Sequence, residues 1–185
     1  MEFTTFGKNS REGSYLLCID LKSAAMLSFG KFMGGREIPL DRGSYLYVGS
    51  ALGSGRGFPL ASRLLRHASR SGCLPPHAIR DSLLEKFRSM GFVPKRETSP
   101  KRLHWHIDYL LDLPEAELTH VFMVMGPSRL EHRLAELVSS MPGISPVADR
   151  LGAQDASSGT HLFKVPDPAE LLERLNRMLP SLLLS

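Results

Sequence analysis

The segment from Gly43 to Ala51, Gly-Ser-Tyr-Leu-Tyr-Val-Gly-Ser-Ala, constrains the fold more than any other part of the chain. Its aromatic and β-branched residues predict a short strand that carries Tyr45 and Tyr47 on one face. A glycine-rich loop follows over 51–59, and a helix is predicted over 60–70. This order of strand, loop and helix brings the tyrosines opposite the side chains of the helix.

The helix over 60–70 carries four cations or potential cations. Arg63 and His67 lie four residues apart and share one face, as do Arg66 and Arg70. Phenol hydroxyls on a rigid strand, facing an arginine on the next helix, suit the handling of a phosphodiester. A purely structural tyrosine strand is the alternative interpretation. We interpret the glycine-rich loop as a flexible turn. It has no Walker lysine pattern, so phosphate cradling is the weaker alternative.

The remaining periodicity predicts an α+β fold in a single domain over 1–185, with a small mixed or antiparallel sheet flanked by helices. The first two strands are expected to form an antiparallel hairpin, to which the tyrosine strand returns. Further strands are predicted at 13–21, 26–32, 118–125 and 160–165, and further helices at 77–90, 128–140 and 168–184. The last helix is amphipathic, and its expected core stripe is Leu171, Leu172, Leu175, Met178 and Leu179.

The positive charge of the chain is concentrated in its middle. Residues 54–103 hold 11 Lys and Arg against three Asp and Glu, whereas the whole chain has a net charge of +4. A solvated face is the simplest explanation, but a basic region beside the tyrosine strand also matches the footprint of a phosphate-backbone binder. We expect 69–103 to be a basic insertion, because it is too short for a core of its own.

The sequence favours a reduced, cytoplasmic protein that does not enter membranes. No apolar run approaches the length of about 18 residues that suggests a membrane span. The start of the chain lacks the basic and apolar regions of a secretory signal. Cys18 and Cys73 lie far apart and show no spacing typical of a metal site.

A further group of residues could carry chemistry. His104, His106 and Asp108 alternate, so on a strand they would face one side as metal ligands do. Structural hydrogen bonds beside the neighbouring tryptophan are the alternative. Asp155 and His161 could join them in space. No zincin or nucleophile-elbow motif is present in the sequence.

Taken together, the motifs resemble those of the GIY-YIG nuclease superfamily. Its first motif matches Gly13-Ser14-Tyr15, with serine in place of the usual isoleucine, and its second matches Tyr47-Val48-Gly49. The arginine of the following helix matches Arg63, and His67 follows one turn later. The metal-binding glutamate of the superfamily matches Glu131, near the start of the predicted helix over 128–140.

The chain looks most like a widespread branch of that superfamily whose function is unknown. In that branch Tyr-Val-Gly-Ser-Ala, His-Trp-His-Ile-Asp-Tyr-Leu, an acidic helix and a late Gly-(x)2-Asp…His-Leu-Phe recur in order, here at 47–51, 104–110, 128–137 and 152–163. Some members are fused to an endonuclease-III-type repair glycosylase. The branch often has Asp-Cys-x-Cys before the late histidine, whereas this chain has Asp155-Ala156-Ser157-Ser158, so cysteine metal binding there is excluded.

The resemblance implies a metal-dependent, endonuclease-like phosphodiesterase acting on DNA in repair or processing. It implies that Tyr47 activates water and that Tyr15 hydrogen-bonds in the same site. Arg63 would stabilise charge on the phosphoryl oxygens, with His67 assisting, and Glu131 would hold one Mg²⁺ or Mn²⁺. Nucleic-acid contacts are expected at Gly49, Ser50, Arg66 and Arg70. A second cluster of unassigned function is expected at His104, His106, Asp108, Asp155 and His161.

Two other classes of function stay open at this stage. The first is a nucleic-acid-binding module that keeps the fold and the basic surface without cutting. A binder would tolerate loss of the Glu131 carboxylate, whereas an enzyme would not. The second is a small-molecule enzyme built on the histidines and aspartates of the second cluster, which would show no salt-sensitive DNA binding.

Overall fold

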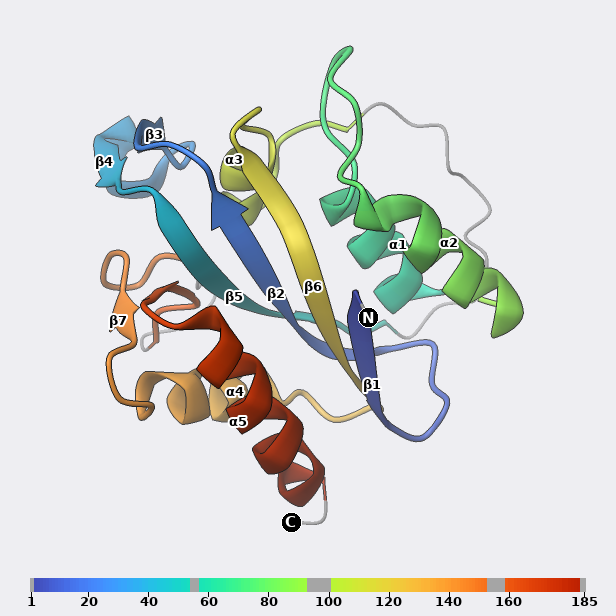
Figure 1. Ribbon diagram of the computed structural model, residues 1–185. Coiled ribbons are helices and arrows are strands. Elements are labelled where there is room, and N and C mark those ends of the chain that lie inside the picture. The colour runs from blue at the N-terminus through green and yellow to red at the C-terminus, as the bar shows by residue number, and fades with distance from the viewer. Residues whose placement is uncertain (1, 54–56, 93–100, 153–158, 184–185) are drawn as a thin grey trace.

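A six-stranded mixed sheet forms the centre of the protein, in a computed structural model that describes residues 2–53, 57–92, 101–152 and 159–183 (Figure 1). The strand order in this sheet is β1-β6-β2-β5-β8-β7, and a separate two-stranded sheet contains β3 and β4. The strands are β1 (Phe3–Gly7), β2 (Gly13–Leu21), β3 (Ala25–Ser28), β4 (Glu37–Leu40), β5 (Gly43–Ala51), β6 (Ala116–Met125), β7 (Ser145–Pro146) and β8 (Leu162–Val165). The predicted α+β class is therefore confirmed.

Helices cover both faces of the main sheet (Figure 1). They are α1 (Pro59–His67), α2 (Ile79–Ser89), α3 (His106–Leu111), α4 (Glu131–Ser139) and α5 (Pro168–Leu182), with a short 3₁₀ turn at Phe32–Gly35. The first three helices pack on one face, and α4 and α5 pack on the other. In the described residues no helix is both long enough and apolar enough to cross a membrane.

Strand β2 lies between β5 and β6 in the sheet, and it is buried on both faces because helices pack on each of them. Its alternating side chains supply two separate cores. Tyr15, Leu17 and Ile19 belong to the core under α1, α2 and α3. Leu16 and Cys18 belong to the core under α4 and α5. A single strand with few polar side chains thus joins the two halves of the hydrophobic interior.

The expected hairpin after β2 does not form. Strand β3 ends at Ser28, short of the predicted 26–32, and pairs with β4 outside the main sheet. Positive φ angles at Gly30 (65°), Met33 (48°) and Gly34 (70°) turn the backbone out of the extended conformation. The partners of β2 come from much later in the chain, as the register Tyr15↔Gly49 and Tyr15↔Met123 shows.

The described part of the segment predicted as a basic insertion, 69–92 and 101–103, contributes side chains to the main core. Ile79, Leu83 and Phe87 of α2 are almost fully buried against the sheet-facing helices. Lys101 is also buried, and its ammonium group lies 3.4 Å from a carboxylate oxygen of Asp112. The charge excess over 54–103 is consequently not all surface charge.

The C-terminal helix is close to its prediction. Asp167 caps α5 by accepting a hydrogen bond from the backbone N–H of Glu170 at 3.0 Å. The buried stripe is narrower than expected and consists of Leu171, Leu175 and Leu179. Leu172 is half-buried, and Met178 is 37% exposed.

Candidate active site

Two tyrosines lie side by side where β2 and β5 meet. Leu17 pairs with Tyr47 and Tyr15 pairs with Gly49, so both phenol rings project from the same face of the sheet. The ring centroids of Tyr15 and Tyr47 are 6.5 Å apart, and the two residues are only 1% and 5% exposed. No protein hydrogen bond holds the Tyr47 hydroxyl within the part of the chain that the structure describes.

Helix α1 places His67 directly against these rings. Pro59 begins the helix, whose apolar face packs on the sheet, and His67 in its last turn points toward the tyrosines. His67 is fully buried, and its Nε2 lies 3.0 Å from the Tyr15 hydroxyl. Its ring centroid is 6.4 Å from that of Tyr47. Burial lowers the pKa of His67 to about 4, so the imidazole is neutral at pH 7.

Asp108 completes this arrangement from a position that the sequence analysis misjudged. His106 to Leu111 form helix α3, so the expected alternation of His104, His106 and Asp108 along a strand is wrong. Asp108 lies in the first turn of α3, fully buried, where its Oδ2 accepts the backbone N–H groups of His104 and Trp105, both at 3.0 Å. This local capping outcompetes the strand pattern over so short a segment.

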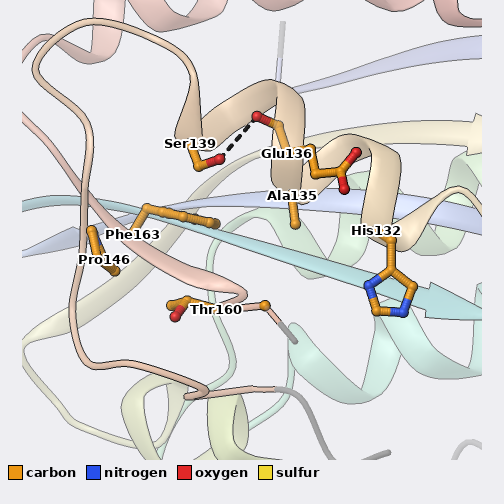
Figure 2. A pocket seen from close by; sticks show the side chains of 8 residues that line it. His132, Ala135, Glu136, Ser139, Pro146, Thr160 and Phe163 are labelled. Carbon is orange, nitrogen blue, oxygen red and sulfur yellow. Dashed lines mark hydrogen bonds between the residues drawn. The ribbon is translucent and has the colours of Figure 1, made fainter. Parts of the chain in front are cut away.

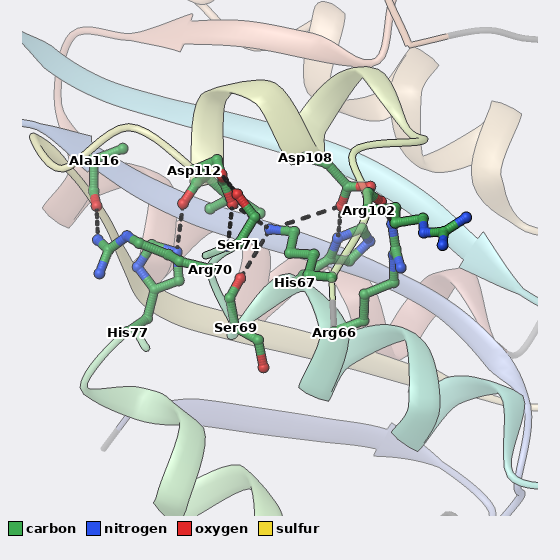
Figure 3. Close-up of polar contacts among 12 residues, drawn as sticks. Arg66, His67, Ser69, Arg70, Ser71, His77, Arg102, Asp108, Asp112 and Ala116 are labelled. Carbon is green, nitrogen blue, oxygen red and sulfur yellow. Dashed lines mark hydrogen bonds and ion pairs between the residues drawn. The ribbon is translucent and has the colours of Figure 1, made fainter. Parts of the chain in front are cut away.

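The carboxylate of Asp108 also contacts two side chains of α1 (Figure 3). Oδ1 lies 3.3 Å from Nδ1 of His67, and Oδ2 accepts a hydrogen bond from Arg66 at 2.9 Å. Burial alone would raise the pKa of Asp108, but the contacts with His67, Arg66 and the backbone N–H of Trp105 outweigh burial and hold the pKa well below its ordinary value. Asp108 is therefore ionised.

Arg63 lies one turn before His67 and bridges the tyrosines to the loop before α3. Its guanidinium stacks on the ring of Trp105, 3.9 Å from the centroid. Burial raises the pKa of Tyr15 above its ordinary value, and the charge of Arg63 partly opposes that rise. The cation is thus close enough to the phenol to stabilise negative charge there.

The two arginines expected to contact nucleic acid, Arg66 and Arg70, both make hydrogen bonds within the protein (Figure 3). Arg70 donates to the carbonyl oxygens of Pro75 and Ala116 and pairs with Glu117 at 3.2 Å, and its side chain is 5% exposed. This place does not fit the expected phosphate contact of Arg70. The side chain of Arg66 is 30% exposed and keeps part of its guanidinium at the surface.

Glu131 lies at the first position of α4, on the other side of the end of β5. Ser50 donates a hydrogen bond to its Oε2 at 2.5 Å. Nδ1 of His161 lies 2.9 Å from its Oε1 without making a hydrogen bond within the described residues. Burial alone would raise the pKa of Glu131, but its contacts with His161 and Ser50 outweigh burial and lower it. The carboxylate is ionised and half-buried.

Ser14 anchors the start of this helix. Its buried Oγ accepts the backbone N–H of Leu130 at 3.1 Å, one residue before Glu131. The N–H groups at a helix start lack intrahelical partners, so a hydroxyl on β2 fixes where α4 begins. The serine at the position of the usual isoleucine in the first motif therefore anchors the start of the helix that carries Glu131.

The structure groups the residues of the two expected clusters differently from the sequence prediction. Asp108 joins Tyr15 and His67, and His161 joins Glu131. His106 accepts the backbone N–H of Gly152 at 3.1 Å, and His104 is exposed against Trp105. Asp155 lies outside the described residues. Within those residues no group of three or more His, Cys, Asp or Glu side chains could hold a metal ion.

A shallow pocket opens on the α4 side of this site (Figure 2). Its volume is about 230 Å³, and it is lined in part by His132, Ala135, Glu136, Gly159, Thr160 and Phe163. The ring of His132 lies 5.9 Å from that of the buried His161. His132, which follows Glu131 in α4, thus lies between this pocket and the ring of His161.

Residues 14–184 match the family described as Domain of unknown function DUF123. The chain belongs to this family. No curated protein and no solved structure matches the chain. The description of the family states no activity, so the resemblance to GIY-YIG nucleases continues to rest on the motifs.

Three partners in the site are not apparent from the sequence. Ser14 stands out there only as a departure from a motif, whereas the expected place of Asp108 and His161 is a separate cluster. Asp108 lies 41 residues after His67, and His161 lies 30 residues after Glu131, so only the tertiary fold brings them together. The aspartate three residues after Trp105 is the one local signal, because it is typical of a helix start.

Proposed function

We propose that this protein is a metal-dependent phosphodiesterase that acts on DNA. The observation that carries the proposal is the convergence of side chains from β2, β5, α1 and α4 at one end of the sheet. Tyr15, Tyr47 and His67 are in ring contact. The charges of Arg63 and Glu131 both act on the two phenols. This is the set of residues that the motifs single out.

The two phenols have different tasks in the proposed reaction. Tyr15 is engaged by His67, whereas the Tyr47 hydroxyl is left for water or substrate. Burial raises the pKa of Tyr47 well above its ordinary value, with the neighbouring Tyr15 and Glu131 adding to the rise. The neutral phenol of Tyr47 orients the attacking water. Arg63 stabilises the charge that develops on the phosphoryl oxygens.

The residues around Glu131 fit one divalent ion. Mg²⁺ is commonly bound through one or two carboxylates together with water and substrate phosphate. The Glu131 and His161 atoms that lie 2.9 Å apart can both be about 2.1 Å from one ion. Neither ring nitrogen of the buried His161 makes a hydrogen bond within the described residues. Glu131 and His161 would hold the ion, which would polarise the phosphate and stabilise the leaving oxygen.

An imidazole ligand affects the choice of ion. Imidazole nitrogen suits transition ions better than Mg²⁺, whereas carboxylate suits both Mg²⁺ and Mn²⁺. We therefore expect Mn²⁺ to bind more tightly than Mg²⁺. His161→Ala should narrow this difference.

The surface cations near the site favour a phosphate backbone as the partner. Arg63 and Arg66 are partly exposed on α1, and Arg102 is exposed next to them in the loop that Arg66 contacts. Arg70 and Lys101 are used internally. Contact with a few phosphates predicts binding that weakens as salt concentration rises.

A nucleic-acid-binding module without cleavage is the second candidate. The observation that favours it is the burial of both phenols, at 1% and 5% exposure. A phosphodiester would reach these hydroxyls only if the loop residues around the site moved. The same cations would then account for binding alone.

The deciding experiment compares wild type with Glu131→Gln on labelled plain, nicked, branched and single-stranded DNA. Cleavage with Mn²⁺ or Mg²⁺ should fall by at least about 10²-fold in the variant, because the metal-holding carboxylate is lost. Binding measured in EDTA should persist. Glu136→Gln, an exposed carboxylate on the same helix, is the matched control and should cut normally.

The other outcomes are equally informative. Salt-sensitive binding with no cleavage by either protein would establish the non-cutting module. Equal cleavage by wild type and Glu131→Gln would disprove the metal site. Absence of both binding and cleavage would overturn the assignment to DNA.

A further inference from the structure

The contacts of His67 define its hydrogen-bonding state. Nδ1 faces the ionised Asp108 at 3.3 Å, and Nε2 faces the Tyr15 hydroxyl at 3.0 Å. A carboxylate can only accept, so the proton of the neutral ring must lie on Nδ1. Nε2 then has a free lone pair, and the Tyr15 hydroxyl must donate to it. Asp108, His67 and Tyr15 form a chain in which each hydrogen bond determines the direction of the next.

We propose that Asp108 is a positioning residue that acts through His67. By holding the His67 ring in one tautomer, Asp108 lets Nε2 orient the Tyr15 hydroxyl and accept the proton of that hydroxyl during the reaction. When the Tyr15 oxygen takes a proton from attacking water, its own proton passes to Nε2 of His67. The resulting imidazolium is paired with the Asp108 carboxylate. The proton returns by the same route when product leaves. This catalytic part rests on the proposed function, whereas the state of His67 at rest does not.

The separate contacts of the two Asp108 carboxylate oxygens distinguish the positioning of His67 from helix capping. The capping contacts use Oδ2, which accepts the backbone N–H groups of His104 and Trp105 and the Arg66 guanidinium. Oδ1 is the oxygen that contacts His67, and Lys101 is its other charged neighbour, at 3.9 Å. An asparagine can keep the capping oxygen while presenting N–H groups to Nδ1. It would force the proton of His67 onto Nε2, the wrong tautomer for accepting from Tyr15.

The test reads the tautomer of His67 directly by ¹⁵N NMR at pH 7, without DNA or metal. Wild type should show a protonated Nδ1 and an unprotonated Nε2, and Asp108→Asn should show the reverse. Asp112→Asn is the matched control, because Asp112 lies at the end of the same helix and bonds Ser71 rather than His67. It should leave the wild-type pattern unchanged.

Two results would overturn the inference. One is a wild-type His67 that carries its proton on Nε2, a measurement that does not require any variant to fold. The other is an Asp108→Asn protein that folds and keeps the proton on Nδ1. If DNA cleavage is found, Asp108→Asn should lower kcat by about 10²-fold or more with KM unchanged. The correct tautomer without any cleavage would instead contradict the proposed function alone.

Discussion

At the scale of single residues, position 49 requires a glycine because a side chain there would collide with Tyr15. Gly49 pairs with Tyr15 across the two central strands. A Cβ at position 49 would lie 2.6 Å from the Tyr15 hydroxyl oxygen, closer than atoms can approach. The absent side chain leaves the space that the buried phenol needs to reach His67.

We predict that Gly49→Ala destabilises the protein by about 1–3 kcal/mol, because the packed Tyr15 ring must shift. It should also weaken the hydrogen bond between Tyr15 and His67. Urea denaturation measures the free energy of unfolding. Gly57→Ala is the control, since a Cβ there meets no atom of the described residues within 4 Å. Equal stability of the two variants would show that the Tyr15 ring has room to move.

At the scale of secondary-structure elements, α2 lies in the basic middle of the chain and contributes apolar side chains to the main core. Phe87 of this helix is fully buried. Near the end of the helix the rings of Phe58 and Phe92 stack, with centroids 5.3 Å apart. The helix packs against α1, which carries Arg63 and His67. Its contribution to the site is therefore support of the helix that positions these side chains.

Phe87→Ala should cost about 3–5 kcal/mol of unfolding free energy, because it leaves a cavity in the main core. Glu85→Ala changes an exposed position of the same helix and should stay within about 0.5 kcal/mol of wild type. Chemical denaturation of both variants checks this expectation. A small effect of Phe87→Ala would mean that α2 is a dispensable surface addition after all.

The elements with strong periodicity could be predicted from the sequence, and the short ones could not. Strand β2 has the predicted bounds of Gly13–Leu21, since its apolar run is long and uninterrupted. The six-residue helix α3 lies where the sequence suggests alternation along a strand. The three alternating polar residues His104, His106 and Asp108 carry too little periodicity to distinguish a strand from a helix. Strand β1 was not predicted, as its pairing with the distant β6 supplies what its own sequence lacks.

The same limit applies to the candidate site. The motifs single out Tyr15, Tyr47, Arg63 and His67, which neighbouring elements bring together. Asp108 and His161 reach the site from later parts of the chain, so their partners depend on the tertiary structure. The surface role expected of Arg70 fails for a related reason. Sequence spacing gives the helix face but not what covers it.

At the scale of the whole molecule, two buried neutral histidines make stability depend on pH. Burial lowers the pKa values of His67 and His77 to about 4. The Nδ1 atom of His77 accepts the backbone N–H of Leu118, while its Nε2 donates to the carbonyl of Leu111. The unfolded chain, with ordinary histidine pKa values near 6.5, binds more protons than the folded protein between about pH 4 and 6.5.

Stability should therefore rise with pH across that window, by about 2–3 kcal/mol for each imidazole between pH 4.5 and 7. Carboxylates with lowered pKa values act in the same direction, so the histidine part is obtained by difference. His77→Gln should flatten the dependence relative to wild type, whereas the exposed His104→Gln should not. Urea midpoints across the pH range measure this, and a parallel profile for His77→Gln would refute it.

The order in which the chain is made sets when the site can exist. Strand β2 lies between β5 and β6, so the central pairing of the sheet is incomplete until residue 125 has been added. The carboxylate of Glu131 follows, and His161 comes later still, next to the strand β8 that pairs with β5. Because chains fold during synthesis from the N-terminus, the tyrosines emerge long before Glu131 and His161. A growing chain on the ribosome, or a fragment truncated before α4, would carry the phenols and cations but not the proposed cutting activity.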